Sequence, residues 1–267
     1  MKHVEIFGIL NLDPESFTGD GIANNPQAAI ARANELFMQG ANYVDIGAES
    51  TRPGAQKLSH EEEWERLHLV LPDLIHGHRD SISLDTYHPE TVRKAAQFGD
   101  FIINDVTSFN NPEMVRAAAE LGLRCIVSHL PYIHRHDIQA AHLTKPIGTP
   151  EQVKDELLAR REELIKAGIN PGKIILDPGI GFGKKPELTW ELLKFGDMVP
   201  GIDVMIGHSQ KSSLNIVPEG MDTLPGKDNK DIERNLYAAE IAIKHGAKYL
   251  RVHNVPAHRE LVNRLAA

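Results

Sequence analysis

The chain has 267 residues and a formal net charge of −8, from 29 basic and 37 acidic side chains. This acidic balance argues against non-specific binding to nucleic acid, and no stretch reaches the roughly 20 apolar residues that span a bilayer. The one cysteine, Cys125, excludes an internal disulfide framework and is expected in the core, because it lies in an apolar run. We therefore expect a cytoplasmic protein with neither nucleic acid nor membrane as a partner.

Short apolar runs alternate with segments of helical spacing along the chain. The runs lie at residues 4–10, 43–44, 81–84, 101–103, 125–127, 174–176, 204–206 and 249–252. Helices are predicted at residues 26–39, 61–75, 89–98, 112–121, 150–167, 186–195, 231–245 and 257–266, and glycines close four of them: Gly40, Gly168, Gly196 and Gly246. Repeated strand–helix units indicate a parallel sheet. We predict one α/β domain over residues 1–267, a single (β/α)8 TIM barrel.

Several connections are longer than such a barrel requires. They lie at residues 13–25, 49–59, 130–149 and 217–229. Long loops on a compact domain are usually functional or disordered. The first three follow predicted strands, so we expect them to rise over the C-terminal mouth of the barrel.

Each apolar run leads into a polar side chain that could carry chemistry. These side chains are Asn11, Asp45, Asp85, Asn104, His129, Asp177, Ser209 with Lys211, and Arg251 with His253. A parallel barrel places its active site at the C-terminal ends of its strands. The sequence therefore predicts that scattered segments converge on one mouth.

Three carboxylates and one amide suggest the kind of ligand this mouth would bind. Asp45, Asp85, Asp177 and Asn104 could grip a flat heterocycle, by accepting hydrogen bonds from its N–H groups and donating to a ring nitrogen or carbonyl. The alternative is that Asp85 and Asp177 cap the helices that follow them.

The cationic side chains suggest an anion site. Arg52, Arg251 and His253 could bind a phosphate or pyrophosphate through charge-assisted bonds, whereas a single Arg near a strand end is as often a surface group. Asn11 could ligate Mg²⁺ through its amide oxygen, or could be a turn residue before Asp13. An anion site shared by the first and last strands requires those strands to be neighbours.

The segment GIGFG at residues 179–183 follows a predicted strand but is not a nucleotide-binding signature. Its spacing differs from GxGxxG, and Lys184 is followed by Lys185 rather than by Ser or Thr. Gly181 and Gly183 are expected to let the backbone turn beneath a ligand, with Phe182 as an apolar wall. No zinc-ligand spacing is present, and His134 and His136 are interpreted as loop residues.

Seven motifs resemble those of one known family. They are GILNLDPESF at 8–17, VDIGAESTRPGA at 44–55, SLDTYHPE at 83–90, INDV at 103–106, DPGIGFGK at 177–184, SQKS at 209–212 and RVHNV at 251–255. In this order and at these separations, they resemble the dihydropteroate synthases, folate-pathway enzymes that sulfonamides inhibit. The resemblance covers residues 7–255.

This resemblance implies a transferase that condenses 6-hydroxymethyl-7,8-dihydropterin pyrophosphate with p-aminobenzoate to give 7,8-dihydropteroate and pyrophosphate by an SN1-like route. It implies that Asp85, Asn104, Asp177 and Lys211 bind the pterin with Asp45 close beneath, and that Asn11, Arg52, Arg251 and His253 bind the pyrophosphate, Asn11 through Mg²⁺. The implied p-aminobenzoate site comprises Ser16, Phe17, Thr51, Arg52, Pro53, Phe182 and Ser209. Asp85, Asp177, Lys211, Arg251 and His253 are the implied catalytic residues. A homodimer formed through C-terminal helices is also implied, and sulfonamides are candidate inhibitors.

The chain departs from the family pattern at several positions. Gln210 stands where Arg is usual, Asn254 where Asp is usual, and Ser128-His129-Leu130 where Met-His-Met is usual. Two alternatives follow: a non-catalytic or regulatory pterin-binding paralogue, and a pterin-dependent methyltransferase. The methyltransferase would not need the STRPG loop or the anion site of Arg251 and His253.

Overall fold

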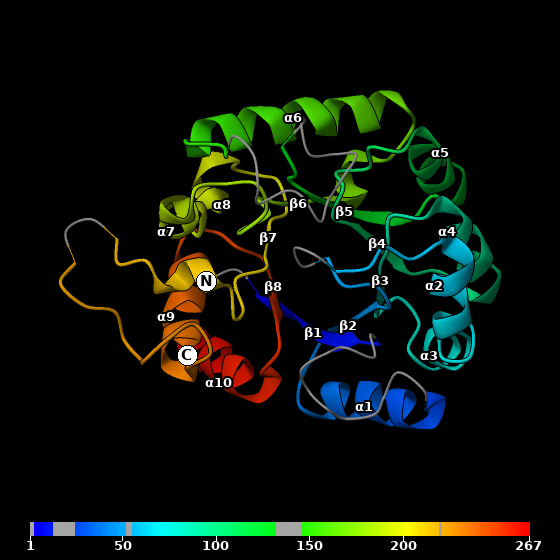
Figure 1. Ribbon diagram of the computed structural model, residues 1–267, viewed down its shortest axis with the longest axis horizontal. Helices are drawn as coiled ribbons and strands as arrows, with labels where there is room; N and C mark the ends of the chain where they lie inside the picture. Colours follow the sequence, from blue (N-terminus) through cyan, green and yellow to red (C-terminus); the bar gives the residue numbers. More distant parts are fainter. Residues whose placement is uncertain (1–2, 13–24, 52–54, 132–145, 219–220) are drawn as a thin grey trace.

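The computed structural model describes residues 3–12, 25–51, 55–131, 146–218 and 221–267, and within them parallel strands alternate with helices (Figure 1). The strands are β1 (Glu5–Asn11), β2 (Tyr43–Gly47), β3 (Ile82–Asp85), β4 (Ile102–Asp105), β5 (Arg124–Ser128), β6 (Ile174–Asp177), β7 (Met205–Ile206) and β8 (Tyr249–Val252). The α-helices are α1 (Pro26–Met38), α2 (His60–Leu67), α3 (Leu71–Gly77), α4 (Pro89–Ala95), α5 (Pro112–Leu121), α6 (Pro150–Lys166), α7 (Thr189–Leu192), α8 (Phe195–Met198), α9 (Ile232–Lys244) and α10 (Val255–Ala266). None of these helices is long and apolar enough to cross a membrane.

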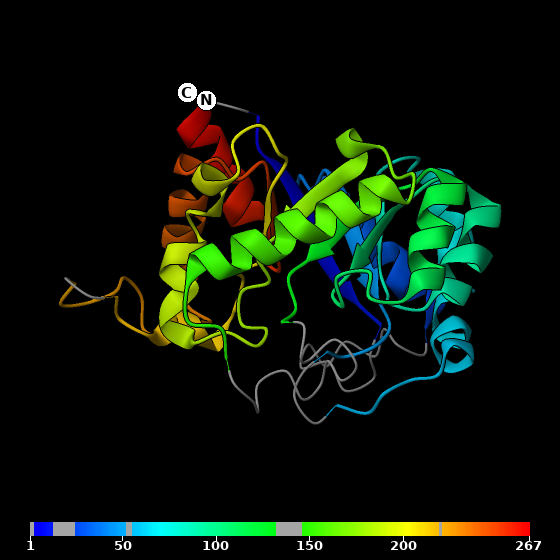
Figure 2. The same cartoon turned by 90° about the horizontal axis from the view of Figure 1, so that it is seen from above.

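The strands form a nearly closed barrel with neighbour order β6-β5-β4-β3-β2-β1-β8-β7. β1 pairs in parallel with both β2 and β8, so the first and last strands are neighbours, as the sequence predicts. Between β6 and β7 the seam is short: Leu176 bridges to Val204, and the Leu176 N–H donates to the Asp203 carbonyl at 2.9 Å. The helices surround the strands, with α6 outside β5 and β6 in Figures 1 and 2. The predicted (β/α)8 barrel is confirmed.

Apolar side chains fill the interior of the barrel. This inner cluster consists of Phe7, Ile102, Ile126, Ile175, Met205 and Tyr249, with Tyr43 packed against it. Phe7 stacks on Tyr43 with ring centroids 4.4 Å apart, and Arg124 donates to the Tyr249 hydroxyl at 2.9 Å. We call this cluster the inner plug, because it closes the barrel below the polar residues.

The two-residue period of the strands places a polar layer directly above the inner plug. Side chains two apart on a strand share one face of the sheet. Asp45 follows Tyr43 by two positions, Asn104 follows Ile102, and Arg251 follows Tyr249. The inner face of each of these strands therefore changes from apolar to polar toward its C-terminal end.

A second apolar layer lies between the barrel and its helices, and it includes the predicted Cys125. Gly8 on β1 is needed for the close packing of two helices. A Cβ atom at this position would lie 3.1 Å from Val255 of α10 and 3.2 Å from Leu36 of α1. Because of this packing, α1 and α10 both lie against β1, the strand that pairs with both β2 and β8.

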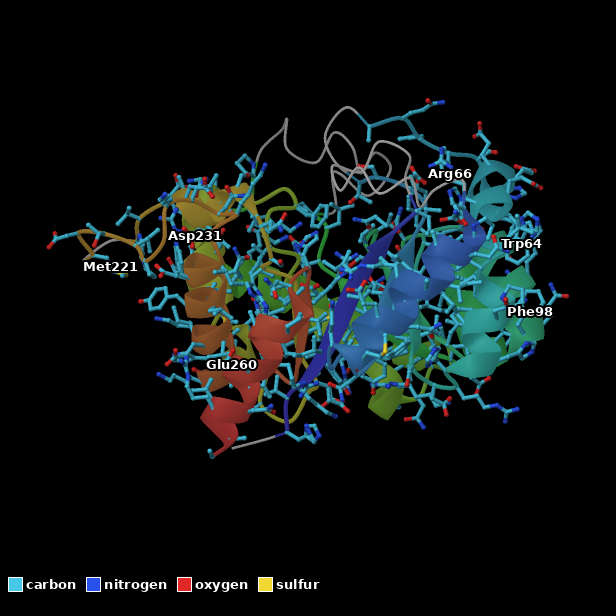
Figure 3. The ribbon with its side chains drawn as sticks, turned by 90° about the horizontal axis from the view of Figure 1, so that it is seen from below. Trp64, Arg66, Phe98, Met221, Asp231 and Glu260 are labelled. Atoms are coloured by element: carbon cyan, nitrogen blue, oxygen red, sulfur yellow. The ribbon has the colours of Figure 1, made fainter. Side chains whose placement is uncertain are left out.

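The helix predicted at residues 61–75 is wrong in one respect, because the chain forms two helices there. α2 ends at Leu67, and α3 begins at Leu71 with Pro72 in its first turn. Proline has no N–H to donate to the preceding turn and disfavours helical backbone before it, so the helix restarts. Trp64 of α2 stacks parallel to Phe98, at the end of the 3-10 turn after α4, with centroids 6.4 Å apart (Figure 3).

The single helix predicted at residues 186–195 is also wrong. A 3-10 turn over Pro186–Leu188 leads into the short helices α7 and α8. Gly196 lies inside α8 and does not close a helix. A Cβ atom there would lie 2.3 Å from the His245 carbonyl oxygen, so glycine is required by close backbone contact.

α10 begins at Val255, two residues before the predicted start. Asn254 is its N-cap, and the Asn254 side chain accepts a hydrogen bond from the Ala257 N–H at 3.2 Å. Asn and Asp are both good N-cap residues. The departure from the family pattern at position 254 therefore keeps the cap.

Candidate active site

Asp45 is the centre of a buried hydrogen-bond network in the polar layer. Its carboxylate accepts from the Ser83 hydroxyl at 2.5 Å, from the Asn104 amide nitrogen at 3.1 Å and from Arg251 Nε at 2.6 Å. Asp45 is fully buried. Both of its oxygens accept hydrogen bonds, so Asp45 fixes the positions of Ser83, Asn104 and Arg251 in the polar layer.

Arg251 joins the buried carboxylate of Asp45 on β2 to the half-buried carboxylate of Asp85 on β3. Its Nε donates to Asp45, and its Nη2 donates to Asp85 Oδ2 at 2.7 Å. Burial raises the pKa of Asp85 to about 7, the Arg251 guanidinium opposes that rise, and the Asp45 charge adds to it. The predicted pyrophosphate residue Arg251 is thus also the counter-ion of the predicted pterin residues.

Asn104 presents a polar atom that no described residue of the chain hydrogen-bonds. Its amide nitrogen is held by Asp45, which directs the amide oxygen elsewhere. That Oδ1 is buried and has no hydrogen-bond partner among the described residues. A buried acceptor without a partner is costly, and a ligand N–H would satisfy it.

Asp177 lies at the end of β6 with 6 % of its surface exposed. Its Oδ1 accepts from the Gly179 N–H at 2.7 Å. Burial raises the pKa of Asp177, while the Gly179 hydrogen bond and the charge of Lys211 lower it. The capping alternative is wrong for both carboxylates: His88 is the N-cap of α4 after Asp85, and Asp177 binds a turn.

Phe182 and Lys211 form a contact pair between the loops after β6 and β7. The Lys211 ammonium lies 4.2 Å from the centroid of the Phe182 ring, a cation–π distance. Gly181 and Gly183 have φ of +84° and +59°, so the predicted glycine turn is confirmed. Ser209 Oγ lies 2.9 Å from His253 Nδ1, and this contact joins the loops after β7 and β8.

The loop that carries Ser209 and Lys211 is braced by α9. The Gln210 N–H donates to Asn235 Oδ1 at 2.8 Å, and the Gln210 carbonyl accepts from Asn229 Nδ2 at 2.6 Å. These contacts use the Gln210 backbone, so they do not depend on the arginine usual at that position. Sequence reasoning missed Asn235, because the periodicity of a helix shows which of its faces is buried but not which distant loop a polar side chain will contact.

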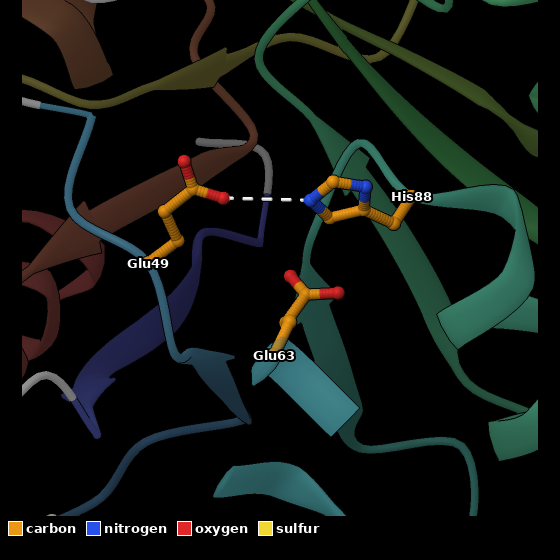
Figure 4. A group of neighbouring side chains, drawn as sticks. All are labelled: Glu49, Glu63 and His88. Carbon is orange, nitrogen blue, oxygen red and sulfur yellow. Dashed lines mark ion pairs between the residues drawn. The ribbon is translucent and has the colours of Figure 1, made fainter. Parts of the chain in front are cut away.

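Glu49, Glu63 and His88 bring possible metal-ligand atoms within 4.8 Å of one another (Figure 4). Glu49 Oε2 lies 3.5 Å from His88 Nε2. Glu63 Oε2 accepts from the hydroxyls of Thr86 at 2.9 Å and Thr91 at 2.5 Å, and burial raises the pKa of Glu63. Sequence reasoning missed this group, because its members come from three separate segments. These contacts hold the segments after β2 and β3 against α2.

The remaining predicted site residues either make no hydrogen bond or ion pair with the other described site residues or lie outside the described part of the chain. Asn11 is exposed at the end of β1 and Thr51 is half-buried after β2; across the described ranges, no hydrogen bond or ion pair joins either one to the other predicted site residues. Outside the described residues lie Ser16, Phe17, Arg52, Pro53, His134 and His136.

Ser83 and Lys184 are the further site residues that sequence reasoning missed. Ser83 stands two positions before Asp85 on β3, so the two-residue period could have assigned it to the inner face. Lys184 was considered only as part of a phosphate-binding loop, although its side chain is almost completely buried.

The polar layer, the buried acceptor of Asn104 and the Phe182–Lys211 pair lie at the C-terminal end of the strands, where barrel enzymes bind small ligands, and so define a barrel enzyme. A family model described as "Pterin binding enzyme" matches residues 7–253. The Escherichia coli K12 dihydropteroate synthase is 34% identical over 263 residues, which cover 96% of this chain and 88% of that protein. The chain therefore belongs to the dihydropteroate synthases, a family of pterin-binding transferases.

Solved structures of this family have the same barrel. The Anaplasma phagocytophilum synthase, with bound 6-hydroxymethylpterin-monophosphate, has a TM-score of 0.82 and 31% identity, with 99% of each chain covered. The Xanthomonas albilineans synthase, with 4-aminobenzoic acid, has a TM-score of 0.81 and 30% identity, with 99% of this chain and 92% of that chain covered.

Proposed function

We propose that this chain condenses 6-hydroxymethyl-7,8-dihydropterin pyrophosphate with p-aminobenzoate to give 7,8-dihydropteroate and pyrophosphate. The observation that carries the proposal is the polar layer, in which Asp85, Asn104 and Asp177 lie around one end of the barrel. Related synthases have been solved with a pterin monophosphate and with 7,8-dihydropteroate.

The pterin would bind edge-on to these three side chains. The carboxylates of Asp85 and Asp177 accept from the amino and ring N–H groups, and Asn104 Oδ1 is the buried acceptor for a further N–H. Asp45 orients Asn104 from below. Lys211 donates to an acceptor on the ring.

The proposed reaction breaks the bond between the exocyclic carbon and the pyrophosphate oxygen. The bonding electron pair leaves with pyrophosphate, and the carbon becomes a cation stabilised by resonance with the pterin. The carboxylates of Asp85 and Asp177 would stabilise the positive charge that spreads over the pterin ring. The amine of p-aminobenzoate then bonds to the carbon and releases a proton, so a strong base is not required.

The proposed leaving-group site comprises Arg251 and His253, with Arg52. The contact between Ser209 and His253 Nδ1 orients the imidazole. Asn11 offers an exposed amide oxygen, the kind of hard ligand that suits Mg²⁺, a cation that usually binds through few protein groups plus phosphate and water. Bound Mg²⁺ would neutralise negative charge on the pyrophosphate.

The p-aminobenzoate pocket is proposed above the pterin. Its residues are Ser16, Phe17, Thr51, Arg52, Pro53, Phe182 and Ser209. Phe182 supports this placement, because its half-buried ring lies beside Lys211 and a phenyl ring packs well against an aromatic substrate.

The synthase is favoured over both alternatives. The Escherichia coli K12 and Neisseria meningitidis MC58 relatives, which match 96% and 95% of the chain, are dihydropteroate synthases, and this argues against the methyltransferase. The paralogue drew its support from Gln210, Asn254 and the altered loop after the fifth strand, which begins at Ser128-His129-Leu130. The first makes loop contacts through its backbone and the second caps α10, so neither substitution removes a structural function.

We further propose that the enzyme is a homodimer, acts in the cytoplasm and is inhibited by sulfonamides. These proposals rest on the family. The single buried cysteine is consistent with a reducing compartment.

A pyrophosphate-release assay with Mg²⁺, the pterin pyrophosphate and p-aminobenzoate tests the proposed reaction. We expect turnover that requires both substrates and falls by about 100-fold or more in Asp177→Asn. Asp197→Asn, a change on the exposed surface of α8, is the matched control and should keep wild-type turnover. Well-folded protein that releases no pyrophosphate above background would refute the synthase and favour the non-catalytic paralogue.

A further inference from the structure

Lys184 places an ammonium group at a junction of three carbonyl groups. Its Nζ donates to the carbonyl oxygens of Phe182 at 2.7 Å, Gly179 at 2.8 Å and His129 at 3.0 Å. Only 8 % of the residue is exposed. An ammonium group has three N–H donors and no acceptor, so these bonds use its full capacity.

The three carbonyls belong to two loops that meet beside the pocket. His129 follows β5, whereas Gly179 and Phe182 belong to the glycine turn after β6. The backbones touch: a Cβ atom on Gly179, at φ of +62°, would lie 2.2 Å from the His129 carbonyl oxygen. The Asp177 carbonyl in turn accepts from the His129 N–H at 2.8 Å.

The backbone beside Lys184 joins a third segment to this junction. The Ile147 N–H donates to the Gly183 carbonyl, and the Lys185 N–H donates to the Ile147 carbonyl, both at 3.0 Å. Ile147 and Lys184 form a parallel bridge just before α6. One residue thus connects the segments that follow β5, follow β6 and precede α6.

The same glycine turn carries two parts of the proposed pocket. The Gly179 N–H binds the Asp177 carboxylate, and the Phe182 ring lies beside the Lys211 ammonium. We propose that Lys184 is a positioning residue for the reaction: it holds the turn that places Asp177 against the pterin and Phe182 against p-aminobenzoate. This inference rests on the proposed function.

Burying the Lys184 ammonium costs free energy, and this cost supports a role for the residue beyond filling space. Three carbonyl oxygens directed at one point repel one another unless a cation lies between them. Burial lowers the pKa of Lys184 to about 7, and the Asp177 charge counters that effect. A buried ammonium is expensive, and an apolar side chain often fills such a site at no loss of stability. The three hydrogen bonds of Lys184 therefore indicate that the lysine is needed to fix the conformation of the glycine turn.

The test compares Lys184→Met, Lys184→Arg and the control Lys185→Met, which changes the adjacent exposed lysine. We expect Lys184→Met to raise the KM for both substrates at least about tenfold, with a smaller change in kcat. Lys184→Arg keeps a cation with several donors and should recover most of the loss. Lys185→Met should have wild-type KM values.

A role confined to stability would lower the melting temperature of Lys184→Met and leave both KM values at wild-type levels, which would overturn the proposal. If Lys184→Met does not fold, Lys184→Gln replaces it, and equal KM values in Lys184→Gln and wild type would also overturn it. Calorimetry with 6-hydroxymethylpterin monophosphate separates this inference from the proposed function. Without wild-type turnover, about tenfold weaker binding by Lys184→Met still supports the positioning role, and unchanged binding refutes it.

Discussion

Arg251 neutralises the buried carboxylate of Asp45 and the half-buried carboxylate of Asp85, and this double ion pair sets the charge at the centre of the polar layer. Asp45 and Asp85 both accept hydrogen bonds from this guanidinium, which is the ionic partner of each carboxylate among the described residues. Removing one member of a buried ion pair leaves an uncompensated charge, which costs more than the net value of the pair itself. We therefore expect Arg251 to contribute to stability and, through the charge of Asp85, to the proposed pterin binding.

We expect Arg251→Met to lower the free energy of unfolding by about 3–5 kcal/mol, measured by urea denaturation. It should also weaken pterin binding, because loss of the guanidinium raises the pKa of Asp85 further and protonates its carboxylate. The double variant Arg251→Met/Asp85→Asn should be more stable than Arg251→Met alone, since one stranded charge is gone. Arg264→Met, at an exposed arginine of α10, is the control. An unchanged urea midpoint in Arg251→Met would contradict this account.

Two buried histidines join the end of β7 to α10 at the scale of secondary-structure elements. His208 follows β7 and His258 lies on α10, and their ring centroids are 5.5 Å apart. Burial lowers the pKa of His208 to about 3, and burial likewise lowers the pKa of His258. The packing of these two elements therefore depends on neutral imidazoles.

This packing predicts a loss of stability in acid. Below pH 6.5 the unfolded chain binds a proton at His208, whereas the folded chain does not until about pH 3. The free energy of unfolding should thus fall as pH falls through this window, with a contribution of up to about 1.4 kcal/mol per pH unit. Urea titrations from pH 7 to pH 4 should show a shallower fall for His208→Gln than for wild type. The exposed control His76→Gln should follow wild type, and equal slopes in His208→Gln and wild type would refute the prediction.

At the scale of the whole molecule, the apolar inner plug and the polar layer of the candidate site occupy opposite ends of the barrel. The inner plug lies toward the N-terminal ends of the strands, and the polar layer lies toward their C-terminal ends. Phe7 is completely buried in the plug, stacked on Tyr43 and edge-on to Tyr249. Such a division lets loops above the barrel vary without loss of the core.

We expect Phe7→Ala to lower the free energy of unfolding by about 3–5 kcal/mol, because it leaves a cavity inside the barrel. The KM values of the folded variant should stay near those of wild type. Phe37→Ala, at a half-buried position on α1, is the control for loss of a phenyl ring and should cost less. Increases in KM as large as those expected for Lys184→Met would show that the plug also shapes the pocket.

The arrangement of the barrel and the members of its polar layer were predictable from local patterns. A strand has a period of two and a parallel strand ends at the site, so Asp85, Asn104 and Asp177 could be assigned to the mouth without coordinates. The β1–β8 pairing was predicted from the hypothesis that Asn11 and Arg251 belong to one anion site. The break in the 61–75 helix was also readable in principle, since Pro72 marks it.

The roles of individual polar atoms could not be predicted in this way, because each depends on a partner distant in sequence. Arg251 meets Asp45 only through the registers of β8 on β1 and of β1 on β2. Gly196 lies inside a helix because another backbone passes beside it. Lys184 reads as a surface lysine until two loops enclose its ammonium. Sequence by itself therefore determined which side chains reach the mouth of the barrel, because the alternation of buried and exposed positions is a local property. Only the tertiary structure decided which of these side chains pair with each other, because packing joins segments that no local pattern relates.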